Sequence, residues 1–209
     1  MSKNIFFFGD SICFGQFISP HKTWVSKLSV ELNKHDSDYI IFNPSHSGDT
    51  TRMVLEKMPF DVQQHGIFSI LIQYGINDSN YWASDNGLQR VSQAAFKANL
   101  IEIIDRAKAF GAKKIFLDTN HPTNKKITVK NKKIEHQIGN RKYNQIIRQV
   151  ALEKKVQLID IERYFLIELN KINKTISHYL LKDGIHLNEE GHKLYYKIVF
   201  PYFKKHKII

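Results

Sequence analysis

The amino-acid sequence predicts an α/β fold, in which helices cover a central, mostly parallel sheet of five strands. Short runs of β-branched and aromatic residues alternate along the chain with longer segments of helical periodicity, which is the pattern of strand–helix–strand units. The runs are apolar almost throughout, as expected of strands buried on both faces. They lie at residues 3–8, 39–43, 69–73, 114–118 and 157–160.

Helices are predicted between the strands, where apolar residues recur at three- and four-residue spacing. The clearest segment is 91–110, in which Phe96, Leu100 and Ile104 share one face and Gly111 follows at a helix C-terminal position. The other segments with this period are residues 24–33, 143–154 and a last one at about 189–203.

Two longer segments, residues 79–90 and 120–138, show no clear period. The first is polar and aromatic, and the second is basic and interrupted by Pro122. Each follows the carboxyl end of a predicted strand, and ligands bind at this edge of an open parallel sheet. We therefore expect both segments to be loops that contact a substrate.

The length and composition are those of a globular protein with a single domain over residues 1–209. Hydrophobic residues make up 42% of the chain and charged residues 24%, which is enough apolar material for a buried core. The one cysteine, Cys13, excludes a disulfide within the chain and a multi-cysteine zinc site, and it suits a reducing compartment. We expect it to be a small buried residue.

The start of the chain predicts no export signal, because the apolar run at residues 5–8 is much shorter than a signal-peptide core. No uninterrupted apolar stretch approaches the roughly 20 residues that cross a bilayer. We therefore expect a cytoplasmic protein without a membrane span.

The chain is basic, with 31 Lys and Arg against 20 Asp and Glu, a net charge of +11. Many lysines gather at residues 125–133 and 204–207, without the interleaved aromatic residues of a base-stacking surface. This distribution favours a solvated basic face, so no nucleic-acid partner is expected. A polyanion-binding module that lacks catalysis remains the alternative from another class of function.

Polar motifs follow three of the predicted strands, and a fourth motif lies in the last loop, from which it can reach the same edge of the sheet. Ser11 ends the triplet Gly9-Asp10-Ser11, and the next motifs are Ser47-Gly48-Asp49, Gly75-Ile76-Asn77-Asp78 and, near the end, Asp183-Gly184-Ile185-His186. Parallel strands bring the first three motifs to one edge of the sheet. Catalysis by a nucleophilic serine needs a hydroxyl, a neighbouring base, an acid that orients the base, and donors for the oxyanion. These motifs contain all four kinds of group.

The four motifs, in this order and spacing, resemble those of the SGNH hydrolases, the GDSL-like lipase and esterase family. The resemblance covers most of the chain and implies a three-layer α/β/α fold, flavodoxin-like in its sheet. It implies that Ser11 is the nucleophile, His186 the base and Asp183 its partner. It also implies an oxyanion hole formed by the backbone N–H groups of Ser11 and Gly48 and by the side-chain amide of Asn77.

Physical chemistry agrees with these roles, although each motif taken alone has a structural alternative. The missing side chain of Gly48 lets a backbone N–H approach a bound acyl group, and Asn77 offers a neutral donor. Alone, Ser11 also suits a helix N-cap, Gly48 a turn and Asn77 a polar loop, and His186 also fits a buried structural histidine. Asp10 is expected to be a structural acceptor.

Other types of active site are not expected. Asp78, like Asp10, is expected to be a structural acceptor, and no second carboxylate pair suggests glycosidase chemistry. The Gly-x-Ser-x-Gly elbow of α/β-hydrolases is absent from the sequence. The remaining histidines, among them His46 and His121, show no tight metal-ligand spacing, so neither a metal nor another cofactor is expected, although these two are candidates to line the pocket.

The sequence therefore predicts a serine esterase that acts on a small-molecule carboxylic ester, a short-chain or sugar O-acetyl ester, through an acyl-enzyme. We expect its activity to fall as the pH falls and His186 takes up a proton. An acyltransferase with the same triad is the alternative among enzymes. Leu187 stands where many members of the family have proline, which affects the expected turn shape after the base.

Overall fold

Five parallel strands form the central sheet of the structure, a computed structural model that describes residues 3–35, 38–206 and 208. Their order across the sheet is β2-β1-β3-β4-β7, and every neighbouring pair is parallel. The strands are β1 (Lys3–Gly9), β2 (Tyr39–Phe42), β3 (Ser69–Gln73), β4 (Lys114–Asp118) and β7 (Gln157–Ile159). All five predicted strands are confirmed to within one residue at each end.

This strand order is the flavodoxin-like one, and it reverses direction between β1 and β3. In the register of these two strands, Gly9 lies opposite Gln73, so both strands end at the same level. Ligands of open α/β sheets bind at the carboxyl edge of such a switch point. The segments after β1 and β3 are the ones that contain Ser11 and Asn77.

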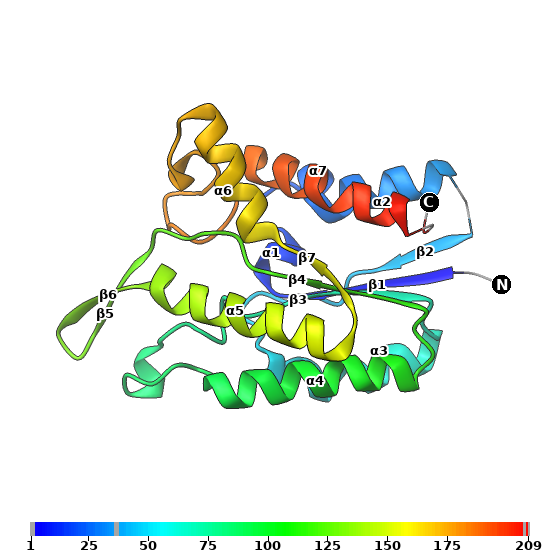
Figure 1. Cartoon of the computed structure of the whole chain (residues 1–209), viewed down its shortest axis with the longest axis horizontal. Coiled ribbons are helices and arrows are strands. Elements are labelled where there is room, and N and C mark those ends of the chain that lie inside the picture. Colours follow the sequence, from blue (N-terminus) through cyan, green and yellow to red (C-terminus); the bar gives the residue numbers. More distant parts are fainter. Residues whose placement is uncertain (1–2, 36–37, 207, 209) are drawn as a thin grey trace.

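Helices cover both faces of the sheet, which gives the predicted three layers (Figure 1). On one face lie α2, α6 and α7, and on the other lie α3, α4 and α5. The bounds are α1 (Ser11–Phe14), α2 (Trp24–His35), α3 (Thr51–His65), α4 (Gln93–Ala109), α5 (His136–Lys154), α6 (Ile161–Ile172) and α7 (Glu189–Lys205). Short 3-10 helices occupy Pro20–Lys22, Ala83–Asp85 and Ile176–His178.

Strand β1 shows how the sequence builds the two cores. Its side chains alternate between the faces, so that Ile5 and Phe7 pack with α2 and α7, whereas Phe6 and Phe8 pack with α3 and α4. All four are fully buried. A strand that is apolar at every position is therefore held from both sides, and the segment that follows it is fixed in place.

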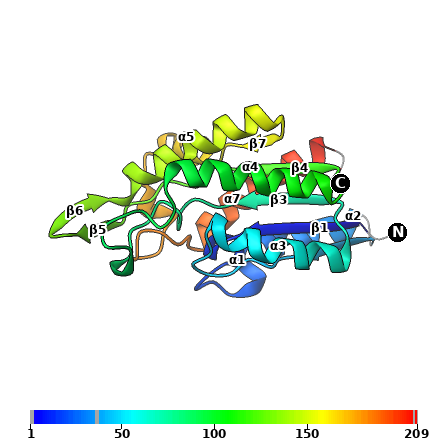
Figure 2. The same cartoon turned by 90° about the horizontal axis from the view of Figure 1, so that it is seen from below.

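The segment 120–138 differs from the prediction of an irregular loop. It contains an antiparallel hairpin, β5 (Lys126–Val129) and β6 (Lys132–Glu135), and helix α5 starts directly after it at His136. The hairpin projects beyond the body at the end away from the N-terminus, as Figure 2 also shows. Helices α3 and α6 were likewise not predicted. Within the described ranges, no helix has the length and apolar character needed to cross a bilayer.

Candidate active site

Ser11 is the first residue of α1, directly after the carboxyl end of β1. The side chain of Asp10 caps this short helix by accepting a 2.9 Å hydrogen bond from the Ile12 N–H. Gly15, in a left-handed conformation, ends the helix after one turn. The tight turn fixes the direction of the Ser11 side chain, and this residue is 4% exposed.

His186 lies between Ser11 and Asp183, in the relation that nucleophilic serine catalysis needs. Its Nε2 atom is 2.9 Å from the Ser11 Oγ atom, and its Nδ1 atom is 2.5 Å from Asp183 Oδ2. When Nδ1–H donates to the carboxylate, Nε2 keeps its lone pair and accepts from the serine hydroxyl. The structure thus brings together three side chains that the sequence places up to 175 residues apart.

The carboxylate of Asp183 is held in place by backbone N–H groups of the loop that contains His186. Its Oδ1 atom accepts hydrogen bonds from the backbone N–H groups of Ile185, at 2.9 Å, and His186, at 3.0 Å. Burial acts to raise the pKa of Asp183, but the hydrogen bonds from the His186 side chain and from these two N–H groups outweigh it and lower the pKa. Asp183 is therefore ionised wherever His186 acts as a base.

Buried contacts from other elements fix the loop that contains His186. His121 Nε2 donates a 2.8 Å hydrogen bond to the Ile185 carbonyl, and the Asn124 N–H donates to the Gly184 carbonyl at 3.0 Å. Burial lowers the pKa of His121 to about 4, so this histidine is neutral near pH 7. It is fully buried, and its hydrogen bond supports the loop from within the protein. The sequence placed His121 near the pocket but gave no sign of this supporting contact.

Gly48 adopts a left-handed backbone conformation, with φ of +85°, at the turn that precedes α3. Its carbonyl accepts a 2.8 Å hydrogen bond from Arg90 Nη1. Neither its N–H nor that of Ser11 has an acceptor among the described residues. Both groups are therefore available as hydrogen-bond donors to a ligand.

Asn77 follows β3 and is 8% exposed. Its Nδ2 atom donates a 3.0 Å hydrogen bond to the Asp49 carbonyl, which links the turn after β2 to the turn after β3. An amide NH₂ has two donor hydrogens, so the second remains available for a ligand. The side chain predicted to bind an oxyanion thus also ties its own loop to the loop of Gly48.

Asp10 and Asp78 are the structural acceptors that the sequence predicts. Asp78 Oδ1 accepts from the Thr51 N–H at 3.0 Å and from the Thr51 hydroxyl at 2.5 Å, which fixes the start of α3. Burial raises the pKa of Asp10 to about 7 and that of Asp78 to about 6, against the opposing effect of these hydrogen bonds. Cys13 is fully buried, as predicted.

Sequence reasoning did not single out Arg90 and Trp82, although both lie in the segment expected to contact a substrate. The Arg90 guanidinium lies over the Trp82 ring, 3.5 Å from its centroid. An added Cβ on Gly48 would lie 3.8 Å from Trp82, so this ring is a direct neighbour of the turn. A second aromatic residue, Phe17, contacts the His186 ring edge-on, with centroids 5.2 Å apart.

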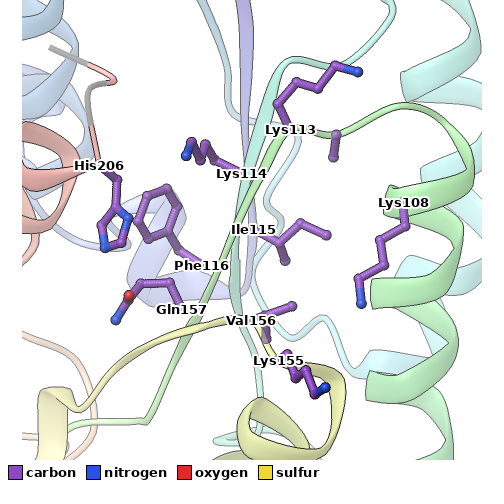
Figure 3. A pocket seen from close by; sticks show the side chains of 10 residues that line it. Lys108, Lys113, Lys114, Ile115, Phe116, Lys155, Val156, Gln157 and His206 are labelled. Atoms are coloured by element: carbon purple, nitrogen blue, oxygen red, sulfur yellow. The ribbon is translucent and has the colours of Figure 1, made fainter.

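A lysine-lined pocket of about 340 Å³ lies at the other edge of the sheet, where β4 and β7 begin (Figure 3). Its lysines are Lys108, Lys113, Lys114 and Lys155. In the close-up their four ammonium groups lie apart and do not meet at one point. Within the described ranges, no group of three or more His, Cys, Asp or Glu side chains could hold a metal ion.

The sheet has the flavodoxin-like order, and at its carboxyl edge a serine, a histidine and a carboxylate lie in hydrogen-bond contact. This arrangement defines a class of serine hydrolase-like proteins. Residues 7–194 match the profile of the GDSL-like lipase/acylhydrolase family. The chain belongs to this family, as the sequence motifs predicted.

Individual relatives are esterases by name. The chain is 31% identical over 123 residues to an arylesterase of Vibrio mimicus, a match that covers 59% of this chain and 58% of that protein. It is 30% identical over 116 residues to the esterase TesA of Pseudomonas aeruginosa, which covers 56% and 54%. The chain thus matches little more than half the length of these relatives.

Solved structures share the fold over nearly the whole chain. The acetyl xylan esterase AlAXEase superposes with a TM-score of 0.78 at 21% identity, covering 95% of this chain and 98% of that one. Axe2, an acetylxylan esterase from Geobacillus stearothermophilus, gives 0.75 at 19% identity, covering 95% and 93%. These likenesses confirm the three-layer architecture.

Proposed function

We propose that this protein is a serine esterase that hydrolyses a short-chain carboxylic ester, with Ser11 as nucleophile, His186 as general base and acid, and Asp183 as the residue that orients the imidazole. The observation that carries the proposal is the 2.9 Å contact between His186 Nε2 and Ser11 Oγ, backed by the carboxylate on Nδ1. A polyanion-binding module without catalysis has no need of this alignment.

The reaction proceeds through an acyl-enzyme. Ser11 Oγ attacks the ester carbonyl carbon while its proton passes to His186 Nε2, and the carbonyl oxygen becomes an oxyanion. The C–O bond to the alcohol then breaks, and His186 returns the proton to the alcohol. Water adds to the acyl-enzyme by the same route, and the acid leaves as Ser11 Oγ recovers its proton.

The oxyanion forms twice, and we propose that the same donors bind it each time. They are the N–H groups of Ser11 and Gly48, for which the described residues offer no acceptor, and the second amide hydrogen of Asn77. Two of these neutral donors belong to the backbone, and the hydrogen bond to the Asp49 carbonyl holds the third, so they stabilise developing negative charge without reorganising. Removal of one such donor typically lowers turnover by roughly 10²–10³-fold.

The proposal is tested by comparing the covalent labelling of the wild type and of Ser11→Ala with a fluorophosphonate probe. We expect one equivalent of label on Ser11 in the wild type, and neither label nor ester hydrolysis in the variant at unchanged thermal stability. Label on another residue in Ser11→Ala, or hydrolysis that survives the substitution, would overturn the assignment. The equally small Ser45→Ala change, at a buried serine that donates to the Phe7 carbonyl, is the matched control for a lost hydroxyl.

The proposed substrate class is an acetyl ester of a sugar hydroxyl. Structural neighbours named acetyl xylan esterases share the fold, and polar loops border the site. An acyltransferase would share the acyl-enzyme and differ only in the acceptor. Acetate release measured with and without free sugar separates the two, because a transferase makes acetylated sugar at the expense of acetate.

The single domain predicted for residues 1–209 is also a proposal. It is supported by the way α2, from the first part of the chain, and α7, from the last part, pack together on one face of the sheet. The cytoplasmic location stays a prediction.

A further inference from the structure

A depression of about 230 Å³ lies between the segment after β3 and the tip of hairpin β5–β6. Tyr81, Trp82 and Asn86 form one wall, and Thr128, Val129 and Lys130 form the other. The two walls come from the two segments that the sequence marked as substrate loops. The depression is lined by an indole, hydroxyl groups, an amide and an ammonium group.

Trp82 connects this depression to the oxyanion donors. Its ring lies next to Gly48, where an added Cβ would be 3.8 Å away, and Arg90 bonds to the Gly48 carbonyl while it stacks on the ring. Arg90 covers one face of the indole, and Trp82 as a whole remains 45% exposed. A group that rests on Trp82 therefore lies beside the turn that contains Gly48.

The hairpin wall is anchored at its tip and at its base. At the tip, Gly87 packs so closely that an added Cβ would lie 3.0 Å from Val129 Cγ1 and 3.1 Å from Lys130 Cε. At the base, the N–H of Asn124 bonds to Gly184, in the loop of the proposed base. The base of the hairpin is thus connected to the loop of His186, and none of the ion pairs between residues that the structure describes includes Lys130.

We propose that this depression is the subsite for the sugar ring that bears the ester, with Trp82 as its stacking platform. This inference rests on the proposed esterase function. The C–H face of a sugar ring packs against an aromatic ring, while Lys130, Asn86 and Thr128 hydrogen-bond to its hydroxyl groups. Asn86, Thr128 and Lys130 are exposed polar residues, so the lining suits a hydroxylated alcohol part of the ester better than an acyl chain.

The test compares an acetylated methyl glycoside with ethyl acetate, whose alcohol has no ring. The readout is the ratio of kcat/KM for the two esters. In Trp82→Ala we expect this ratio to fall roughly tenfold, the effect of losing about 1.4 kcal/mol of binding, with a smaller fall in Trp82→Phe. Leu88→Ala is the matched control, because Leu88 is a large apolar residue of the same segment that is 72% exposed. It should keep the wild-type ratio.

Binding without turnover gives an independent readout. The other tryptophan, Trp24, is fully buried and cannot contact the glycoside. When the glycoside binds to Ser11→Ala, the fluorescence emission that changes should therefore be that of Trp82. This change should vanish in the double variant that also carries Trp82→Phe. A ratio unchanged in Trp82→Ala, or lowered equally in Leu88→Ala, would overturn the subsite. Ser11-dependent hydrolysis of ethyl acetate would still support the esterase in that case, whereas its absence in the wild type would refute the proposed function itself.

Discussion

Arg90 holds Gly48 with one side of its guanidinium group and stacks on Trp82 with its face. The hydrogen bond from Nη1 to the Gly48 carbonyl is 2.8 Å, and the guanidinium carbon is 3.5 Å from the centroid of the indole ring. Gly48 has a positive φ, so its backbone depends on such contacts to stay in one conformation. Arg90 is thus a positioning residue for a proposed oxyanion donor.

Substitution of Arg90→Lys should lower kcat about tenfold with little change in KM for ethyl acetate, because a displaced donor weakens transition-state binding more than substrate binding. The rate of fluorophosphonate labelling should fall in parallel. Arg106→Lys is the matched control, since Arg106 Nη1 also donates to a backbone carbonyl, that of Leu55, at 2.9 Å and away from Ser11. Equal effects in both variants would show that Arg90 is merely structural.

A second prediction concerns Gly184, between the proposed acid and base. Its φ is +74°, and an added Cβ would lie 2.3 Å from Asn124 Oδ1 and 2.9 Å from the Lys125 nitrogen. Gly184→Ala must therefore displace the loop of His186. We expect a roughly 10²-fold loss of kcat, the usual effect of a displacement of about 1 Å at a catalytic group.

Gly66→Ala is the control for this variant, because Gly66 has a similar φ of +67° and nothing within 4 Å of an added Cβ. It should show only the cost of a left-handed alanine, about 1–2 kcal/mol in urea unfolding, with normal kcat. If Gly184→Ala loses no more activity than Gly66→Ala, steric contact with Asn124 does not position the base.

Strands β1 and β3 were predictable because they are buried on both faces and so carry a continuous apolar run. The edge strands β2 and β7 are only partly buried but are also mainly apolar. The hairpin was not predictable from the sequence. Its two-residue turn is Lys130-Asn131, and both residues have a positive φ. Turns of this type are usually recognised from Asn-Gly or Asp-Gly. Helix α3 contains Pro59, which reads locally as a helix breaker. Asp160 is the last residue of the predicted strand and also the N-cap of α6. Because the residue was assigned to the strand, the start of the helix was not recognised.

The site divides in the same way. Ser11, Gly48 and Asn77 stand in short motifs after strands, and Asp183 and His186 stand in one motif of the last loop. The order of these motifs along the chain therefore predicts that they meet. The side chain of Arg90 bonds to the carbonyl of Gly48, which is 42 residues away in the sequence. No local sequence pattern predicts such a contact. Long-range contacts of this kind depend on the packing of whole elements, which periodicity does not specify.

A third prediction concerns the buried carboxyl of Asp10, whose pKa burial raises to about 7 from an ordinary value of 3.8. Between these pH values the folded chain holds a proton that the unfolded chain has released, so the contribution of Asp10 to stability falls as the pH rises. Asp10→Asn keeps the cap on the Ile12 N–H and does not titrate. The free energy of unfolding of the variant, minus that of the wild type, should therefore increase from about pH 4 to pH 7 and then level off.

Asp78→Asn is the companion variant, measured by urea unfolding over the same pH range. Because burial raises the pKa of Asp78 to about 6, the same difference should rise in the same direction but level off at a lower pH. A difference for Asp10→Asn that stays constant from pH 4 to pH 8 would show that this carboxyl is ionised in the folded protein throughout.

The last prediction tests Asp183 by Asp183→Asn. The amide oxygen can still accept from the Ile185 and His186 N–H groups, but the NH₂ group replaces the acceptor that faces Nδ1. Nδ1 then becomes the acceptor and Nε2 carries the proton, so His186 cannot take a proton from Ser11. We expect kcat to fall by about 10²–10⁴-fold with the fold and KM retained.

Two measurements check this tautomer argument. The downfield proton resonance of Nδ1–H should be present in the wild type and absent in Asp183→Asn. Asp105→Asn, which neutralises an exposed carboxylate paired with Lys154, should keep full activity. The hydrogen bonds to Asp183 lower its pKa in the folded protein. The contribution of Asp183 to the stability of the fold is therefore present above the ordinary pKa of an aspartate, and it is lost as the pH falls through the lowered pKa. Activity above one tenth of the wild type in Asp183→Asn would show that the carboxylate does not select the tautomer of His186.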